Sequence, residues 1–134
     1  MAVIQTARLE LASEQDIVRA RQAVRKLAQE HRFGVVDQTK LVTAASELAR
    51  NAVVYGGGGF VEIELLTEDG RRGMRLRFVD DGPGIADVGL AMTDGWTSGK
   101  GLGLGLSGAK RLSSEFELDS APGRGTRVTI ARWI

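Results

Sequence analysis

The pattern of apolar and polar positions at the start of the chain predicts a strand followed by a helix. Polar and apolar residues alternate from Arg8 to Leu11, as in a half-buried strand, and we place this strand at residues 3–11. Ser13 and Asp16 then form a Ser-x-x-Asp pattern, which is typical of a helix N-terminus. This first helix is expected to end near residues 33–34. Its apolar residues recur at helical spacing: Ile17, Ala20, Val24, Leu27 and Ala28.

A second helix is predicted to begin at Asp37 and to be stopped by four consecutive glycines at residues 56–59. The apolar positions between these limits form one broad stripe, which indicates a helix that packs on a core. They are Leu41, Ala44, Ala45, Leu48, Ala49 and Ala52.

Two segments with a period of two predict an antiparallel hairpin. The first contains Val61, Ile63 and Leu65, and the second contains Met74, Leu76 and Phe78. The turn-forming residues 68–70, Glu-Asp-Gly, connect the two segments.

The chain from Asp80 to Gly105 has no clean periodicity and is rich in glycine. A loop of this length inside a compact domain is usually functional. The remaining pattern predicts these elements: a helix at 104–113, a strand at 116–120, a turn at 121–123 and a closing strand at 126–133.

This order of elements predicts an α+β fold. Hairpins mixed with helices favour a two-layer α/β sandwich, in which about three helices cover one face of a mixed, mostly antiparallel sheet. A doubly wound parallel fold would need regular strand–helix–strand alternation, which the pattern lacks. The length of 134 residues favours a single domain over residues 1–134.

Composition excludes several classes of function. A net charge of +1, from 18 basic and 17 acidic residues, gives no field to hold nucleic acid. With no cysteine, the chain has no disulfide, thiolate metal site or cysteine nucleophile. No segment approaches the roughly 20 apolar residues of a membrane span, and the N-terminus lacks a signal-peptide pattern. We therefore expect a cytoplasmic protein that binds neither nucleic acid nor membrane.

Glu47 and Asn51 lie four residues apart on the predicted second helix and so share one face, at the border of its apolar stripe. The amide oxygen of Asn51 is a suitable ligand for Mg²⁺, and Glu47 can accept a proton from an attacking hydroxyl. From spacing alone, the alternative is that both are solvated helix residues.

The segment Asp80-Asp-Gly-Pro-Gly-Ile85 directly follows a predicted strand. A carboxylate at a strand end can accept a hydrogen bond from the exocyclic amine of a purine, and Gly82 and Gly84 let the backbone approach a flat ring. The alternative is an ordinary tight turn, because this sequence is also strong turn chemistry.

The segment Lys100-Gly-Leu-Gly-Leu-Gly-Leu106 has alternating glycines that run into a helix. Free N–H groups in such a segment can bind the phosphates of a nucleotide. The literal Gly-x-Gly-x-x-Gly match from Gly103 is not a dinucleotide motif, because no strand precedes it, and the spacing is wrong for a P-loop. Lys100 can contact a phosphate, although a lone lysine in such a loop is more often solvated.

Two further residues have local explanations. Thr126 opens the last strand after Gly123-Arg-Gly and can complete a base pocket by hydrogen bonding, or it can be a plain strand residue. His31, the only histidine, is expected to be a surface or C-cap residue of the first helix.

The four motifs together resemble the GHKL ATPase/kinase superfamily. Their order is Glu-x-x-x-Asn on a helix, Asp-x-Gly-x-Gly after a strand, a glycine loop into a helix, and Gly-x-Gly-Thr before the last strand. Within that superfamily the chain is similar to the anti-sigma-regulatory serine/threonine kinases of the RsbT type, related to RsbW and SpoIIAB. The similarity covers nearly the whole chain, and the motifs are highly specific when taken together.

The resemblance implies a role for each motif residue. Glu47 would be the catalytic base and Asn51 the Mg²⁺ ligand, while residues from about 86 to 100 would form an ATP lid. Nucleotide contacts would come from Asn51, Asp80, Gly82, Gly84, Ile85, Lys100, Gly101, Leu102, Gly103, Gly105 and Thr126.

The resemblance also implies ATP and Mg²⁺ as cofactors and a reaction that transfers the γ-phosphoryl group to a serine of a STAS-domain antagonist protein. A PP2C-type phosphatase would be an alternative partner. Two other interpretations compete with this one: a nucleotide-dependent switch that binds a partner without catalysis, and the ATP-binding half of a histidine kinase. The second is disfavoured because no phosphoacceptor segment is evident.

Overall fold

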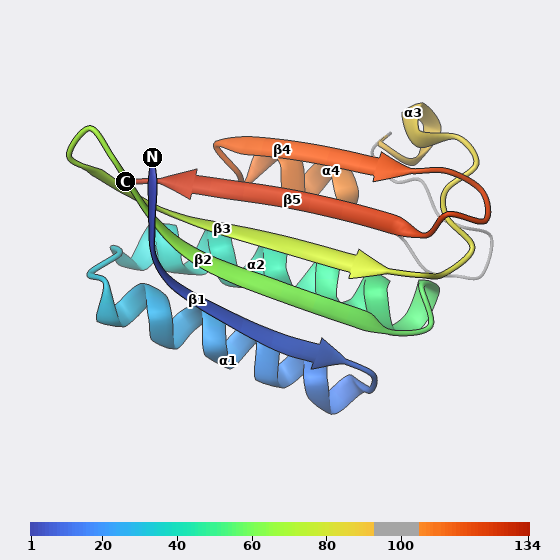
Figure 1. Ribbon diagram of the computed structural model, residues 1–134, viewed down its shortest axis with the longest axis horizontal. Coiled ribbons are helices and arrows are strands. Elements are labelled where there is room, and N and C mark those ends of the chain that lie inside the picture. Colours follow the sequence, from blue (N-terminus) through green and yellow to red (C-terminus); the bar gives the residue numbers. More distant parts are fainter. Residues whose placement is uncertain (93–104) are drawn as a thin grey trace.

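The computed structural model describes residues 1–92 and 105–134, and in these ranges the chain forms two layers (Figure 1). The strands are β1 (Ala2–Leu11), β2 (Gly59–Glu68), β3 (Arg71–Asp80), β4 (Glu115–Ser120) and β5 (Thr126–Trp133). The helices are α1 (Glu14–Glu30), α2 (Val35–Arg50), α3 (Val88–Ala91) and α4 (Leu106–Arg111), and a π-helical turn, η1 (Asn51–Tyr55), continues α2.

The five strands form one sheet in the order β1-β2-β3-β5-β4. The four pairings among them are all antiparallel. Figure 1 shows α1, α2 and α4 on the same side of this sheet. The predicted two-layer α+β sandwich with about three covering helices is therefore confirmed.

The helix ends follow local chemistry. At the start of α1, the Asp16 carboxylate accepts the N–H groups of Ala12 (2.9 Å) and Ser13 (3.3 Å). His31 is the C-cap of α1, as expected. The helix ends a few residues before the predicted limit because Arg32 has a positive φ of 62°, and the chain then returns Phe33 to the core.

Two elements were not predicted from the sequence. The five-residue π turn η1 follows α2, because an apolar stripe does not distinguish a helix with i→i+4 hydrogen bonds from one turn with i→i+5 bonds. The short helix α3 has only four residues, too few to show a period. Its start is held by Asp87, whose side chain accepts the N–H of Leu90 at 2.9 Å.

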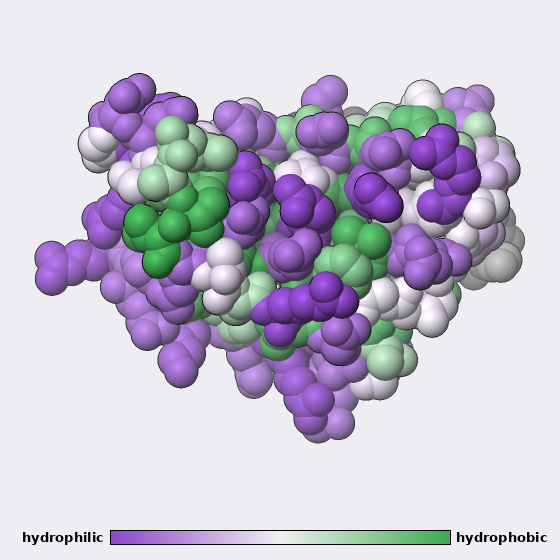
Figure 2. Space-filling model, viewed as in Figure 1, coloured by the Kyte–Doolittle hydropathy of each residue, from purple (hydrophilic) through white to green (hydrophobic). Residues whose placement is uncertain are grey.

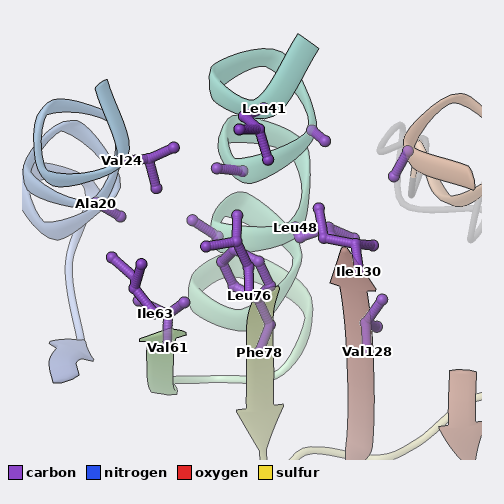
Figure 3. Packing of buried hydrophobic residues seen from close by; sticks show 14 of the residues in the cluster. Ala20, Val24, Leu41, Leu48, Val61, Ile63, Leu76, Phe78, Val128 and Ile130 are labelled. Atoms are coloured by element: carbon purple, nitrogen blue, oxygen red, sulfur yellow. The ribbon is translucent and has the colours of Figure 1, made fainter. Parts of the chain in front are cut away.

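The core lies between the helices and the sheet, where side chains from both layers point toward one another (Figure 3). Helix α2 is central, and its small residues Ala45 and Ala49, both fully buried, allow neighbouring elements to pack close to it. Leu48 of α2 and Leu76 of β3 are at most 1% exposed. Helix α2 continues through η1 toward the end of β3. The packing of α2 on the sheet therefore sets the position of η1 relative to the end of β3.

The opposite face of the sheet is largely polar, with apolar patches among its charged side chains (Figure 2). Arg75 and Glu64 form an ion pair at 2.7 Å on adjacent strands, and Arg77 and Glu62 form another at 3.5 Å. The alternation of apolar and polar residues in β2 and β3 therefore separates the core from this open face. In the described ranges, we find no helix with the length and apolar character that crossing a membrane requires.

We predict that Leu76→Ala destabilises the protein by about 2–5 kcal/mol, because the truncation leaves a cavity beneath α2. Urea unfolding followed by circular dichroism measures the change. Val36→Ala is the control: Val36 is 64% exposed, and we expect a change within about 0.5 kcal/mol. An equal loss in the two variants would contradict the packing described above.

Candidate functional site

A cavity of about 20 Å³ lies where the end of β3 meets η1, the start of α4 and the start of β5. This volume has room for about one water molecule, so a larger ligand requires its walls to move apart. The cavity is lined by Leu48, Asn51, Ala52, Tyr55, Phe78, Asp80, Ile85, Leu106, Thr126 and Val128. Four predicted site residues are thus brought together: Asn51, Asp80, Ile85 and Thr126.

Asp80 supplies the one carboxylate of this lining. It is the last residue of β3 and is only 8% exposed. Burial raises the pKa of this carboxyl, and the neighbouring charge of Asp81 raises it further. Hydrogen bonding to the backbone N–H groups of Gly82 and Thr126 opposes this shift, and the Gly82 N–H lies 2.9 Å from Asp80 Oδ1. The site therefore holds a desolvated hydrogen-bond acceptor.

Glycines allow the backbone to close around Asp80. A Cβ at Gly56 would overlap the Asp80 carboxyl group. Only glycine therefore allows the backbone after η1 to come this close to Asp80. Gly84 has a φ of +75°, and a Cβ there would overlap the carbonyl oxygen of Ala121. Gly56 was predicted only as part of a helix stop, whereas Gly84 was predicted as a site residue.

The segment from Gly82 to Ile85 is held from two sides. The Tyr55 hydroxyl of η1 donates to the Gly84 carbonyl at 3.1 Å. From the other side, the N–H of Ile85 donates to Ser120 Oγ at 2.8 Å. This segment therefore has a defined position relative to both Asp80 and η1.

Sequence reasoning missed Tyr55 and Ser120 as site residues. Tyr55 had a signal, because it follows Asn51 at the spacing of one helical turn. Ser120 had none, because its partner Ile85 lies 35 positions away along the chain.

Asn51 and Glu47 lie one helical turn apart at the junction of α2 and η1. The side-chain oxygen of Asn51 is buried, and Asn51 lines the cavity. Glu47 is half-buried and does not line the cavity but lies beside Gly105, where a Cβ would come 2.7 Å from Glu47 Oε2. Gly105 has a φ of +63° and precedes α4. The structure therefore brings Glu47 to the start of α4, next to the cavity.

The other predicted phosphate contacts, Lys100, Gly101, Leu102 and Gly103, lie outside the described residues, as does most of the predicted lid. A larger open groove of about 590 Å³ lies on the polar face of the sheet, between residues such as Arg77, Glu117 and Thr129. It contains none of the predicted site residues.

Asn51 is a residue of the cavity lining whose donor chemistry suits Mg²⁺. The amide oxygen of Asn51 is a hard donor of the kind that Mg²⁺ accepts, and this ion typically takes only one or two protein ligands beside water and phosphate oxygens. The donor chemistry of Asn51 therefore fits a magnesium–nucleotide complex.

The family model described as "Histidine kinase-, DNA gyrase B-, and HSP90-like ATPase" matches residues 36–133. The chain belongs to this family. Its predicted membership of the GHKL superfamily is thereby confirmed.

Two curated relatives of this GHKL domain are regulatory proteins of bacteria. The serine/threonine-protein kinase RsbT of Bacillus subtilis (strain 168) is 45% identical over 124 residues, which cover 92% of this chain and 93% of that protein. The anti-sigma F factor of Clostridium novyi (strain NT) is 32% identical over 101 residues, 70% of this chain and 69% of that protein. The predicted resemblance to anti-sigma-regulatory kinases of the RsbT type is confirmed.

Solved structures share the GHKL fold. The RsbU and RsbW domains of a Mycobacterium tuberculosis protein match with a TM-score of 0.66 and 24% identity, over 96% of this chain and 32% of that chain. The SiaB–SiaC complex from Pseudomonas aeruginosa matches with a TM-score of 0.54 and 16% identity, over 98% of this chain and 91% of that chain.

We predict that Asp80→Asn raises the melting temperature of the nucleotide-free protein at pH 7. Since the pKa of Asp80 is higher in the folded than in the unfolded chain, the stability that Asp80 contributes is fully present below its ordinary pKa of about 3.9. It is lost as the pH rises through the raised value. Asparagine stays neutral, so the advantage of the variant should shrink as the pH falls from 7 toward 4.

Calorimetric melting at pH 7 and pH 4.5 measures this difference. Asp119→Asn is the control, because Asp119 is an exposed carboxylate on β4, and its melting temperature should match the wild type. A wild-type protein that is more stable than Asp80→Asn at pH 7 would show that Asp80 supports the fold rather than the site.

Proposed function

We propose that this protein is a serine/threonine kinase that transfers the γ-phosphoryl group of ATP to a serine of a STAS-domain antagonist protein in a bacterial partner switch. One observation supports this most: a buried carboxylate, a hydroxyl and an amide oxygen meet around one cavity. The chain is also 45% identical to a protein kinase over 92% of its length.

In this proposal Asp80 recognises the base. An ionised carboxylate only accepts hydrogen bonds, so it pairs with the exocyclic amine of adenine. Ile85, which is 4% exposed, would pack against the ring, and Thr126 would add a hydroxyl. Gly82 and Gly84 allow the adjoining backbone segments to pack closely, because a Cβ at Gly82 would overlap the backbone of Gly56 and a Cβ at Gly84 would overlap that of Ala121. Gly105 would contact the phosphates, together with Lys100, Gly101, Leu102 and Gly103, which lie outside the described residues.

Asn51 would hold Mg²⁺ through its amide oxygen. A magnesium ion bound there would neutralise charge on the phosphates, which is a large part of what phosphoryl transfer requires. Its position one helical turn from Glu47 would place the metal ligand and the proton acceptor on one side of the nucleotide.

Glu47 would act as the general base. The serine oxygen of the partner forms a bond to the γ-phosphorus, the bond from that phosphorus to the bridging oxygen of ADP breaks, and the serine proton passes to the Glu47 carboxylate. The half-buried position of Glu47 beside Gly105 is consistent with a carboxylate that a partner's hydroxyl can reach.

The proposed function also implies a cellular location and a second partner. A switch of this kind would operate in the cytoplasm, with a PP2C-type phosphatase as a second partner.

One alternative has its own support, because an anti-sigma F factor is 32% identical to this chain over 70% of its length. In that alternative the protein binds its partner in a nucleotide-dependent way without catalysis, and Glu47 is the residue that separates the two.

We predict that Glu47→Gln lowers phosphoryl transfer at least about a hundredfold, because glutamine cannot accept the proton. ATP affinity should stay within about twofold. The assay combines γ-labelled ATP, Mg²⁺ and a STAS-domain partner, and locates the label on serine. Glu117→Gln, an exposed change on β4, is the matched control and should transfer normally. If Glu47→Gln transferred the phosphoryl group at the wild-type rate, Glu47 would not be the general base.

We also predict that Asp80→Asn weakens ATP binding about tenfold to a hundredfold, the effect of losing a hydrogen bond to a charged group. Isothermal calorimetry with Mg²⁺ measures it, on protein whose melting curve shows that it is folded. If the wild type takes up neither ATP nor ADP, the proposed function fails. Binding without transfer to any STAS partner would instead favour the non-catalytic switch.

A further inference from the structure

Ser120, the last residue of β4, contacts three groups behind the cavity. Its Oγ accepts the N–H of Ile85 at 2.8 Å, lies 2.9 Å from the carbonyl oxygen of Gly125, and lies 2.9 Å from Thr126 Oγ1. Ile85 and Thr126 both line the cavity, whereas Ser120 does not. Ser120 is therefore placed to act on the cavity only through its neighbours.

The protons in this cluster can be assigned by counting. A serine hydroxyl has one proton and two lone pairs. A carbonyl oxygen has no proton, so the contact with Gly125 uses the Ser120 proton. The N–H of Ile85 occupies one lone pair of Ser120. The remaining lone pair must then accept the proton of the Thr126 hydroxyl.

This assignment determines what Thr126 offers to a ligand. Its only proton is directed at Ser120, so the Thr126 hydroxyl presents only lone pairs to the cavity. Asp80, when ionised, also presents only lone pairs. Asp80 of β3 and Thr126 of β5 are paired neighbours in the sheet. Their side chains are therefore two adjacent hydrogen-bond acceptors. At the position of the C6 substituent of a purine, such a wall suits an amino group, whose two protons can go to the two acceptors, and disfavours a carbonyl oxygen, which can only accept.

We propose that Ser120 is a positioning residue that keeps Thr126 as a hydrogen-bond acceptor and thereby adds to the selection of a 6-amino purine nucleotide over a 6-oxo purine nucleotide. This inference rests on the proposed binding of ATP at Asp80. It assigns part of the base selectivity to a residue that does not touch the base.

Removing the Ser120 hydroxyl has a defined consequence. In Ser120→Ala the Thr126 hydroxyl loses its acceptor, so it can rotate and donate its proton into the cavity. A 6-oxo base then gains a hydrogen bond that the wild type denies it. One neutral hydrogen bond is worth about 0.5–1.5 kcal/mol, which corresponds to about a twofold to tenfold change in affinity.

The test measures the dissociation constants of ATP and inosine triphosphate on each preparation of the full chain with Mg²⁺. The quantity compared is their ratio, which does not depend on the fraction of protein that is folded. We expect Ser120→Ala to lower the preference for ATP about twofold to tenfold. Ser113→Ala is the matched control, because the Ser113 hydroxyl donates to the Ala109 carbonyl at 2.7 Å, and Ser113 does not line the cavity. It should keep the wild-type ratio.

A double-mutant cycle separates positioning from a merely structural role. In a Thr126→Val background, Ser120→Ala should leave the ratio unchanged, because the hydroxyl through which Ser120 acts is absent. Ser120→Thr retains a hydroxyl and should restore the wild-type ratio. If Ser120→Ala does not fold, Ser120→Cys removes the strong acceptor with less change in volume and should show the same fall.

Two results would overturn the inference while leaving the proposed function intact: a Ser120→Ala ratio equal to the wild type, or an equal fall in the Thr126→Val background. If the wild type binds neither nucleotide, the proposed function fails and this inference fails with it.

Discussion

The burial of one carboxylate, Asp80, is the constraint on which the arrangement of this protein depends. A charge removed from water at the end of a strand is costly unless backbone donors surround it. The N–H groups of Gly82 and Thr126 meet part of that need, and Gly56 gives the carboxylate room because it has no side chain. The fold therefore keeps at this end of the sheet a carboxyl group whose ionisation is opposed by its burial.

The two layers combine to make this burial possible. Helix α2 packs along the sheet with fully buried alanines, and its continuation η1 carries Asn51 and Tyr55 to the end of β3. A π turn is frequently found at functional sites, and it turns side chains away from the positions that a regular helix gives them. Here it places Asn51 in the cavity lining while Tyr55 holds the Gly84 carbonyl. The proposed general base, the proposed metal ligand and the proposed base pocket are thus connected through one helical element.

The small volume of the cavity means that its walls must move before a nucleotide base can enter. At about 20 Å³, it holds no base without movement of its walls. Leu106, which is 2% exposed and opens α4, is one of the residues that fill it. Gly105, with its positive φ, directly precedes this leucine and lies against Glu47. A movement at the start of α4 that makes room for an adenine ring would therefore also change the surroundings of Glu47, the proposed general base.

The sequence by itself determined most of the elements and indicated which motif residues to expect at one site. Period and turn residues are local, so β5 was predicted at its observed limits, and Asn51, Asp80 and Thr126 were recognised from short motifs. Only the tertiary structure decided that Gly56 packs on Asp80 and that the hydroxyls of Ser120 and Thr126 lie 2.9 Å apart. The reason is that close approach and hydrogen-bond polarity arise between residues that are distant in the chain, and no local pattern records which of them meet.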